Sequence, residues 1–389
     1  IGGAFWTPGV TVIGGTSKKT FDQLIKSLFA ASEPGAWYDP SDMSTLFQDS
    51  AGTVPVTAAE QPVGRILDKS GRGNHASQAT STKRPVLSAR VNLLTKTEAF
   101  GDAVWDKAGI TVGTAPTDGG STTAPDGTST ARLYTVSAST FVRRELAFPS
   151  GLQGSAKVYV RAGLVSPATA VRITTNNTLN WSTGFSTKAA LTREWQLVTH
   201  SGVLQTGSAV VFLMFGAVDA NGANDADCVG SIELWHPSLV PADQASLPYQ
   251  RVNTATDYDA DPAKFPAYLR FDGVEDALQT GNIDFTSTDK MTVWAGVTPL
   301  LAGGSQWIAS NSGSPVGRFS LISDASGLSQ FESRGSSGSY AQVAPLMSGQ
   351  VLCGGGDISG DVSVLRRNGA QVASKFADQG TGNYGNAPM

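Results

Sequence analysis

The chain has 389 residues, enough for two or three domains of ordinary size. Charged residues make up only 15% and there are 44 glycines, which is typical of short strands joined by tight turns and not of a helical enzyme. The net charge is −4 and the basic residues are scattered, which argues against nucleic-acid binding. No run of 18 apolar residues occurs, so we expect no membrane insertion.

One amphipathic helix is predicted near the N-terminus, over about residues 17–31. Thr20 followed by Gln23 fits a capping box at its start. The apolar stripe packs either on the chain's own sandwich or against a partner chain, and both interpretations stay open. Its members recur with the 3.6-residue period of one helix face: Phe21, Leu24, Ile25, Leu28 and Phe29.

Strands dominate the rest of the chain. Seven predicted strands between about residues 93 and 250, separated by Gly, Asn, Ser and Pro clusters, indicate a sandwich or jelly roll. They are 132–136, 141–148, 156–161, 171–175, 194–199, 210–218 and 231–235. A second group of strands is predicted at 268–271, 277–280, 291–297, 307–310, 319–323, 328–333, 341–344 and 362–367. Asn368-Gly369 then predicts a tight hairpin into 370–374, because a type I′ turn needs two residues with positive φ.

Two distant stretches resemble parts of one known kind of domain. They are AWYDPSDMSTLFQDSAG with LDKSGRGNHASQAT (Ala36–Gly52 and Leu67–Thr80), and YLRFDGVEDALQTG (Tyr268–Gly281). Together they resemble the laminin-G-like, concanavalin A-like sandwich of phage and prophage tail proteins. In that family the two motifs are close in sequence, whereas here about 190 residues intervene, so the resemblance implies an insertion.

The intervening segment has a resemblance of its own. Its start, NLLTKTEAFGDAVWDKAGITV, and its end, SIELWHPSLVPADQASLPYQRV, look like the carbohydrate-binding-module-like jelly rolls of phage structural proteins. We therefore expect an all-β chain of two β-sandwich or jelly-roll units, one inserted in the other, after a short N-terminal helix. The expected parts are an N-terminal docking or oligomerisation segment (1–35), a first laminin-G-like part (36–91), the insertion (92–258) and a second laminin-G-like part (259–389).

The resemblance implies a virion structural protein of a phage tail, a tail fibre or tail-tip component that contacts host surface polysaccharide without catalysis. It also implies a homotrimer that binds other tail proteins. A purely architectural tail or baseplate protein, a tailspike-like polysaccharide-degrading enzyme and a bacterial surface adhesin are the alternatives. The family continues past the NYGNAP segment with a further strand, so we expect truncated ends and missing C-terminal strands.

Aromatic residues with polar neighbours are the candidate ligand-binding residues, since sugars bind to ring faces beside a few polar groups. Trp181 lies in a polar loop with Asn177 and Asn180, and Trp105 is the further candidate in the insertion. Four other tryptophans are predicted to be core residues: Trp37, Trp195, Trp235 and Trp294.

The sequence predicts no cofactor, and a structural Ca²⁺ site stays open as the alternative, because oxygen-rich loops suit this ion. Asp272, Asp276 and Asp39 are its predicted ligands. The polar stretch from Asp68 to His75 is either a structural turn or part of a polar or metal site.

Catalytic patterns are weak. Glu145, Glu194, Glu233 and Glu332 lie in predicted strands, but no two of them form the strand pattern of a glycosidase carboxylate pair. The three histidines form no zinc-binding pair, so the sequence predicts a protein that is not an enzyme.

Overall fold

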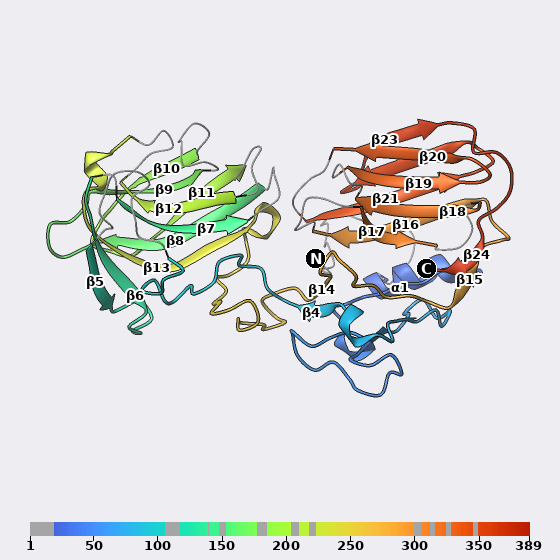
Figure 1. Cartoon of the computed structure of the whole chain (residues 1–389), viewed down its shortest axis with the longest axis horizontal. Coiled ribbons are helices and arrows are strands. Elements are labelled where there is room, and N and C mark those ends of the chain that lie inside the picture. The colour runs from blue at the N-terminus through green and yellow to red at the C-terminus, as the bar shows by residue number, and fades with distance from the viewer. Residues whose placement is uncertain are drawn as a thin grey trace.

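The computed structural model describes residues 19–105, 117–138, 140–147, 153–176, 185–203, 210–217, 223–298, 305–311, 316–323, 328–344 and 349–389. The described chain is all-β apart from one short α-helix and a few 3₁₀ turns, as predicted. Figure 1 shows two β units side by side, one formed by the middle of the chain and the other by its two ends. Within the described ranges, no helix has the length and apolar character that crossing a membrane requires.

The middle unit is a sandwich of two antiparallel sheets. One has the strand order β10-β9-β12-β7 and the other β11-β8-β13-β6-β5. Between them lies an apolar core that includes Tyr134, Val158, Ile173, Phe215 and Leu234. The strands are β5 (Thr117–Thr122), β6 (Ala131–Val136), β7 (Phe141–Ala147), β8 (Gln153–Ala162), β9 (Ala170–Asn176), β10 (Phe185–Ala190), β11 (Gln196–Val203), β12 (Val210–Gly216) and β13 (Gly230–Pro241).

The second sandwich packs the sheet β16-β21-β22-β23 against the sheet β17-β18-β19-β20. Its core includes Phe285, Phe319, Phe331, Leu352 and Leu365. The strands are β16 (Lys290–Val297), β17 (Gln306–Ser310), β18 (Arg318–Ser323), β19 (Ser329–Arg334), β20 (Gly338–Val343), β21 (Gln350–Asp357), β22 (Val362–Arg367) and β23 (Ala370–Phe376). The Asn368-Gly369 hairpin between β22 and β23 is confirmed, with φ of 50° and 84° at the two turn residues.

Short strands from both ends of the chain surround this sandwich. β14 pairs with β4, so that Tyr268 lies opposite Ser88 although about 180 residues separate them. The chain therefore enters and leaves the middle unit at adjacent positions. The exact domain boundaries remain a prediction. These strands are β1 (Leu46–Phe47), β2 (Arg65–Ile66), β3 (Ala76–Ser77), β4 (Val86–Ser88), β14 (Tyr268–Arg270), β15 (Asn282–Asp284) and β24 (Asn386–Pro388); the 3₁₀ turns are η2 (Met43–Thr45), η3 (Ser81–Lys83), η4 (Ala226–Cys228) and η5 (Ala242–Gln244).

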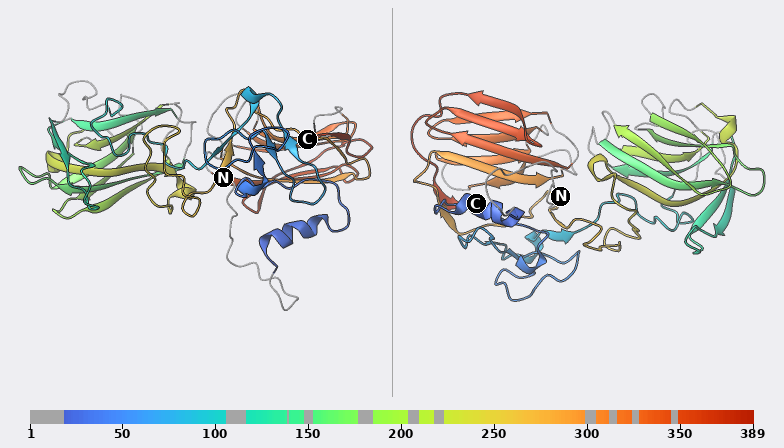
Figure 2. Two further views of the ribbon diagram at one scale, coloured as in Figure 1. Left: turned by 90° about the horizontal axis from the view of Figure 1, so that it is seen from below. Right: turned by 180° about the vertical axis from the view of Figure 1, so that it is seen from behind.

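The N-terminal helix is shorter than predicted. α1 covers Phe21–Lys26 and continues as the 3₁₀ turn η1 (Ser27–Phe29), while the capping box of Thr20 and Gln23 is present. No residue of α1 is buried, and Figure 2 shows α1 standing away from the sandwich. A helix of six residues has little stability alone, and its contacts come mainly from the Phe21 ring against Trp37 and from the ion pair of Asp22 with Lys69.

Two buried amides join the segments that enter and leave the middle unit, at what we call the neck. Gln250 Oε1 accepts hydrogen bonds from the backbone N–H groups of Val91 and Asn92, at 2.8 and 3.0 Å. Asn92 Nδ2 donates to the carbonyl oxygens of Gln250 and Pro237. Both side chains are fully buried. The neck is thus a hydrogen-bonded junction in which each buried amide satisfies backbone groups of the other segment.

Candidate functional site

Of the four predicted ligand-binding residues, the structure describes only Trp105. Trp181, Asn177 and Asn180 lie outside the described residues. Trp105 is only 1% exposed, its ring packs on Phe100 with centroids 4.8 Å apart, and its Nε1 donates to the carbonyl oxygen of Lys96. The ring of Trp105 has no free face for a sugar, so we assign it to the core.

The predicted calcium ligands are engaged separately. Asp39 accepts hydrogen bonds from Ser41 and forms an ion pair with Lys69. Asp272 and Asp276 close their own loop, in which Asp272 Oδ1 accepts the N–H of Asp276 and Asp276 Oδ2 accepts the N–H of Asp272. Across the described ranges, no three acidic, histidine or cysteine side chains converge as metal ligands. Asp39 is therefore not brought together with the other two.

The polar stretch from Asp68 to His75 forms a closed turn. The carboxylate of Asp68 accepts hydrogen bonds from the N–H groups of Trp37, Ser70 and Asn74, and the N–H of Asp68 donates to His75 Nδ1. Burial would raise the pKa of Asp68, but these hydrogen bonds outweigh it and keep the pKa below its usual value. This arrangement fits the structural interpretation of the stretch.

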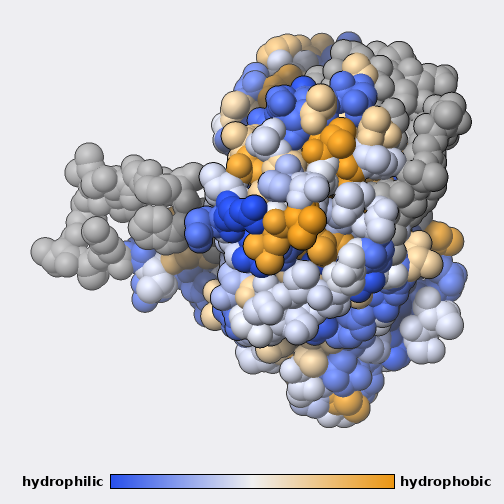
Figure 3. Space-filling view, turned by 90° about the vertical axis from the view of Figure 1, so that its left-hand side faces the viewer, coloured by the Kyte–Doolittle hydropathy of each residue, from blue (hydrophilic) through white to orange (hydrophobic). Residues whose placement is uncertain are grey.

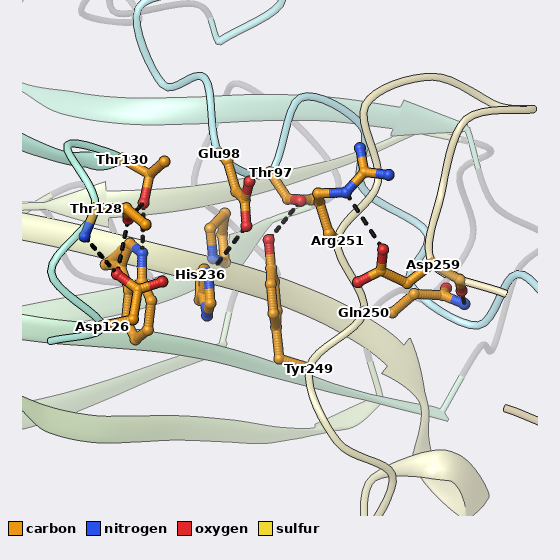
Figure 4. A network of polar contacts seen from close by, with 12 residues as sticks. Thr97, Glu98, Asp126, Thr128, Thr130, His236, Tyr249, Gln250, Arg251 and Asp259 are labelled. Carbon is orange, nitrogen blue, oxygen red and sulfur yellow. Dashed lines mark hydrogen bonds and ion pairs between the residues drawn. The ribbon is translucent and has the colours of Figure 1, made fainter. Parts of the chain in front are cut away.

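The neck carries a second polar cluster, drawn in Figure 4. The rings of Trp235, His236 and Tyr249 stack, with centroids 3.4 and 3.6 Å apart, and Glu98 lies 3.2 Å from His236 Nε2. Burial lowers the pKa of His236 from 6.5 to about 4 and raises that of Glu98. The cavity beside Glu98 has a volume of about 120 Å³, well below the roughly 300–1,000 Å³ of ligand pockets. The ring stack is therefore a structural part of the neck.

Two tryptophans of the second sandwich are exposed. Trp307 on β17 is 57% exposed and Trp294 on β16 is 55% exposed. The prediction that Trp294 is a core residue is wrong, because β16 alternates and points Met291, Val293, Ala295 and Val297 toward the core instead. The face of an exposed aromatic ring is a candidate contact for the apolar face of a ligand.

The tryptophans of the middle unit are less accessible. Trp235 and Trp195 belong to a small cluster with Tyr159 on the outer side of the five-stranded sheet. Trp235 is buried, as predicted, whereas Trp195 is half-buried under the guanidinium of Arg161, 4.7 Å from its ring centroid. Figure 3 views the molecule from the end where the middle unit lies and shows an apolar patch there. The large exposed apolar side chains of that unit are aliphatic: Leu164, Val165, Leu197 and Val229.

Trp307 belongs to the outer face of the sheet β17-β18-β19-β20. Pairing places residues in cross-strand rows: Trp307 opposite Ile322, Ile322 opposite Gln330, and Gln330 opposite Gln342. Since strands lie about 4.8 Å apart, this row spans roughly 14 Å. We call this surface the β17–β20 face; its members are Trp307, Arg318, Ser320, Ile322, Gln330, Glu332, Arg334, Tyr340 and Gln342.

An ion triad lies toward the end of the face that is away from the Trp307 row. Arg318 donates two hydrogen bonds to Glu332, both 3.0 Å long, and Arg334 Nε donates a third at 2.8 Å. Ser320 Oγ donates to the same carboxylate, and Arg334 Nη2 donates to Tyr340 Oη. Burial would raise the pKa of Glu332, but the hydrogen bonds from the two arginines outweigh it and lower the pKa. Glu332 therefore stays ionised and positions both guanidiniums.

Two glutamines complete the face. Neither Gln330 nor Gln342 makes a side-chain hydrogen bond with any part of the chain that the structure describes. Each amide offers two donors and an acceptor, and Gln342 is exposed while Gln330 is half-buried. An exposed indole can stack on one sugar ring, while amides and guanidiniums elsewhere on the same sheet face can hydrogen-bond the hydroxyls of the neighbouring sugars.

Sequence reasoning missed this face, although the alternation of Phe319, Leu321 and Phe331 with polar residues carries a signal for it. Glu332 was considered only as a catalytic candidate. Like Glu332, Glu233 is buried and bound by an arginine, since Arg161 Nη2 lies 3.0 Å from its Oε2. The lowered pKa of Glu332 does not fit a carboxyl group held protonated for acid catalysis.

No protein-family model matches the chain, and no curated protein matches it. Among solved structures it is similar to a carbohydrate-binding module, "CBM4 structure and function", with 13% identity, 32% of this chain and 77% of that chain covered, and a TM-score of 0.25. A Xylanase10C mutant from Cellvibrio japonicus in complex with xylopentaose is 15% identical; the match covers 34% of this chain and 28% of that chain, with a TM-score of 0.24. The mouse laminin alpha1 chain, domains LG4-5, is 12% identical; the match covers 63% of this chain and 77% of that chain, with a TM-score of 0.22. Similarities this weak carry no conclusion about the ligand or activity of this chain.

Proposed function

We propose that this chain is a non-catalytic phage tail protein, a tail fibre or tail-tip component, that binds a host surface glycan on the β17–β20 face. The exposed Trp307, in one cross-strand row with the unpaired amides of Gln330 and Gln342, is the observation that carries the binding role. The tail location rests on the sequence motifs alone, those around Asp68–His75 and Phe271–Asp276.

The β17–β20 face suits weak binding that is repeated by several copies of the chain. One indole and a few hydrogen bonds give a modest affinity for one site. Copies of the chain held together in a virion would multiply it, because each further contact becomes intramolecular. Non-catalytic attachment therefore needs no deep cleft, and a sheet face with an exposed ring can serve it.

The test is binding of the purified chain to an array of bacterial surface polysaccharides, with three variants. Trp307→Ala is expected to weaken binding by about tenfold or more, since losing a stacking ring removes at least about 1.4 kcal/mol. Trp307→Phe retains a ring and is expected to retain part of the affinity. Trp294→Ala is the matched control, because Trp294 is equally exposed on the opposite sheet. Unchanged binding of Trp307→Ala, with the fold verified by thermal melting, would contradict the proposal.

An architectural role is the second candidate, and α1 is the observation that favours it. Phe21, Leu24 and Leu28 are 53%, 41% and 46% exposed, so the apolar stripe of α1 is not covered by the chain itself. A homotrimer that packs these stripes together is the expected assembly. Light scattering should give a trimer for the wild type and a smaller species for Leu24→Ser with Leu28→Ser. A wild-type monomer at micromolar concentration would contradict this role for α1.

A further inference from the structure

The β17–β20 face has an excess of one positive charge, because it carries two arginines and one glutamate. The glutamate has almost no surface of its own. Glu332 is 2% exposed, and both of its oxygens already accept hydrogen bonds. The side chains of Arg318 and Arg334 remain 29% and 24% exposed. A ligand on this face therefore meets guanidinium donors and no accessible carboxylate.

Each guanidinium keeps donors for a ligand. Arg318 uses Nε and Nη2 on Glu332, while Arg334 uses Nε on Glu332 and Nη2 on Tyr340. Neither Nη1 group has a hydrogen-bond partner among the residues that the structure describes. Guanidiniums fixed by a carboxylate lose little side-chain freedom when they bind an oxyanion.

Stability alone does not account for the triad. Removing charges from water costs several kcal/mol per ion, and buried ion triads are often no more stabilising than apolar side chains of the same volume. Neutral polar residues on the outer face of this sheet would avoid the free-energy cost of taking these charges out of water. The placement of a buried carboxylate that holds two arginines at an exposed surface suits anion recognition.

We infer that the β17–β20 face recognises an acidic polysaccharide, one whose sugars carry a carboxylate or a phosphate. This inference rests on the proposed function and specifies its ligand. The oxyanion pairs with Arg318 and Arg334, while another sugar of the same chain stacks on Trp307.

The spacing of these residues sets a minimum ligand length. Ile322, the neighbour of Trp307, is four residues from Arg318 on β18. At about 3.4 Å per residue these positions are roughly 14 Å apart, farther than one pyranose ring reaches. The ligand therefore contains at least two or three linked sugars, and a free uronic acid cannot occupy both parts of the face.

The experiment compares acidic polymers with neutral derivatives of the same backbone. Polygalacturonate and alginate are tested against their carboxyl-reduced forms, and bacterial lipopolysaccharide against its product after removal of phosphate with hydrofluoric acid. These arms separate a carboxylate from a phosphate. Binding is measured for the wild type, Arg334→Gln, Trp307→Ala and, as control, Arg366→Gln, which changes an exposed arginine on the opposite sheet.

The wild type is expected to bind at least one acidic polymer about tenfold more tightly than its neutral derivative, since one charge-assisted hydrogen bond contributes about that factor. Arg334→Gln is expected to remove this preference while the Arg318–Glu332 pair preserves the fold, and Arg366→Gln to leave it unchanged. Equal binding of acidic and neutral forms, or an unchanged preference in Arg334→Gln, would overturn the inference and leave the proposed function intact. Binding unaffected by Trp307→Ala would instead contradict the proposed site, and no binding to any polymer would contradict both.

Discussion

Asn92 and Gln250 are 158 residues apart in sequence, yet each holds the backbone of the other's segment at the neck. Asn92 Oδ1 also accepts the N–H groups of Leu94 and Leu239. Replacing Asn92 by alanine would leave these buried groups without partners. We expect Asn92→Ala to lower the free energy of unfolding by about 2–4 kcal/mol, measured by urea denaturation. Gln371→Ala, on an exposed strand position, is the control and should change it by less than about 0.5 kcal/mol.

Two adjacent glycines of β21 should respond in opposite ways to the same substitution. A Cβ on Gly354 would overlap the ring of Phe331 in the core, whereas a Cβ on Gly355 would meet no atom within 4 Å. We expect Gly354→Ala to destabilise the sandwich by about 1–3 kcal/mol through overpacking. Gly355→Ala should be neutral or slightly stabilising, because alanine loses less chain entropy on folding. Thermal melts of equal midpoint for the two variants would show that the packing against Phe331 is not as described.

Glu332 is the group whose loss should most disturb the β17–β20 face. Glu332→Gln keeps the shape of the side chain but leaves Arg318 and Arg334 without a counter-charge. We expect a loss of about 1–3 kcal/mol in the free energy of unfolding, below the value for a deeply buried triad because both arginines are partly solvated. Adding Arg334→Gln should cost less in this background than in the wild type. Additive effects of the two substitutions would contradict the coupling seen in the hydrogen bonds.

The neck should make the fold sensitive to acid. The pKa of His236 is about 4 in the fold and about 6.5 in an unfolded chain, so the unfolded state binds more protons between these values. Stability therefore rises with pH across this window and is lost as the pH falls from 6.5 to 4. Burial raises the pKa of Glu98, so near the acid end of this window the folded state binds the Glu98 proton more tightly than the unfolded state does. Glu98 therefore opposes part of the loss of stability caused by His236.

The variant His236→Asn tests this pH dependence. His236 has a φ of 50°, a conformation that asparagine also tolerates. The slope of the melting temperature against pH between 4 and 6.5 should be smaller in the variant than in the wild type. Part of the slope should remain, because burial also lowers the pKa of His200, which bonds Thr175 and Thr187 inside the middle unit. An identical slope in the two proteins would show that His236 does not contribute to the acid sensitivity of the fold.

Local signals in the sequence predicted much of the fold. The hairpin at Asn368-Gly369 and the capping box at Thr20 follow from turn and cap chemistry alone. The strand β21 was not predicted, because Gly354, Gly355 and Gly356 look like a loop in isolation. In the structure the side chains of Phe331 and Tyr384 fill the space beside two of these glycines. A strand at 277–280 was predicted but is wrong, because only Gln279 forms an isolated bridge there.

The candidate site was harder to predict than the fold. Alternation along β18 and β19 assigns Arg318, Ser320 and Glu332 to an outer face, but strand register decides which of them meet. Trp105 was predicted to bind a ligand, but its ring packs in space on Phe100 and Phe215, contacts that depend on the fold. Trp294 was predicted to be a core residue, but the alternation of β16 turns Val293 and Ala295 inward and Trp294 outward.

The most direct test of the central claim is the indole N–H spectrum of the protein during titration with a bound oligosaccharide. The chain has eight tryptophans, and the resonances are assigned by single substitutions. We expect the Trp307 signal to shift with ligand concentration, while the signals of the buried Trp105 and of Trp294 on the other sheet stay unchanged. A ligand that binds and leaves the Trp307 signal unmoved, while that of another tryptophan shifts, would contradict the assignment of binding to the β17–β20 face.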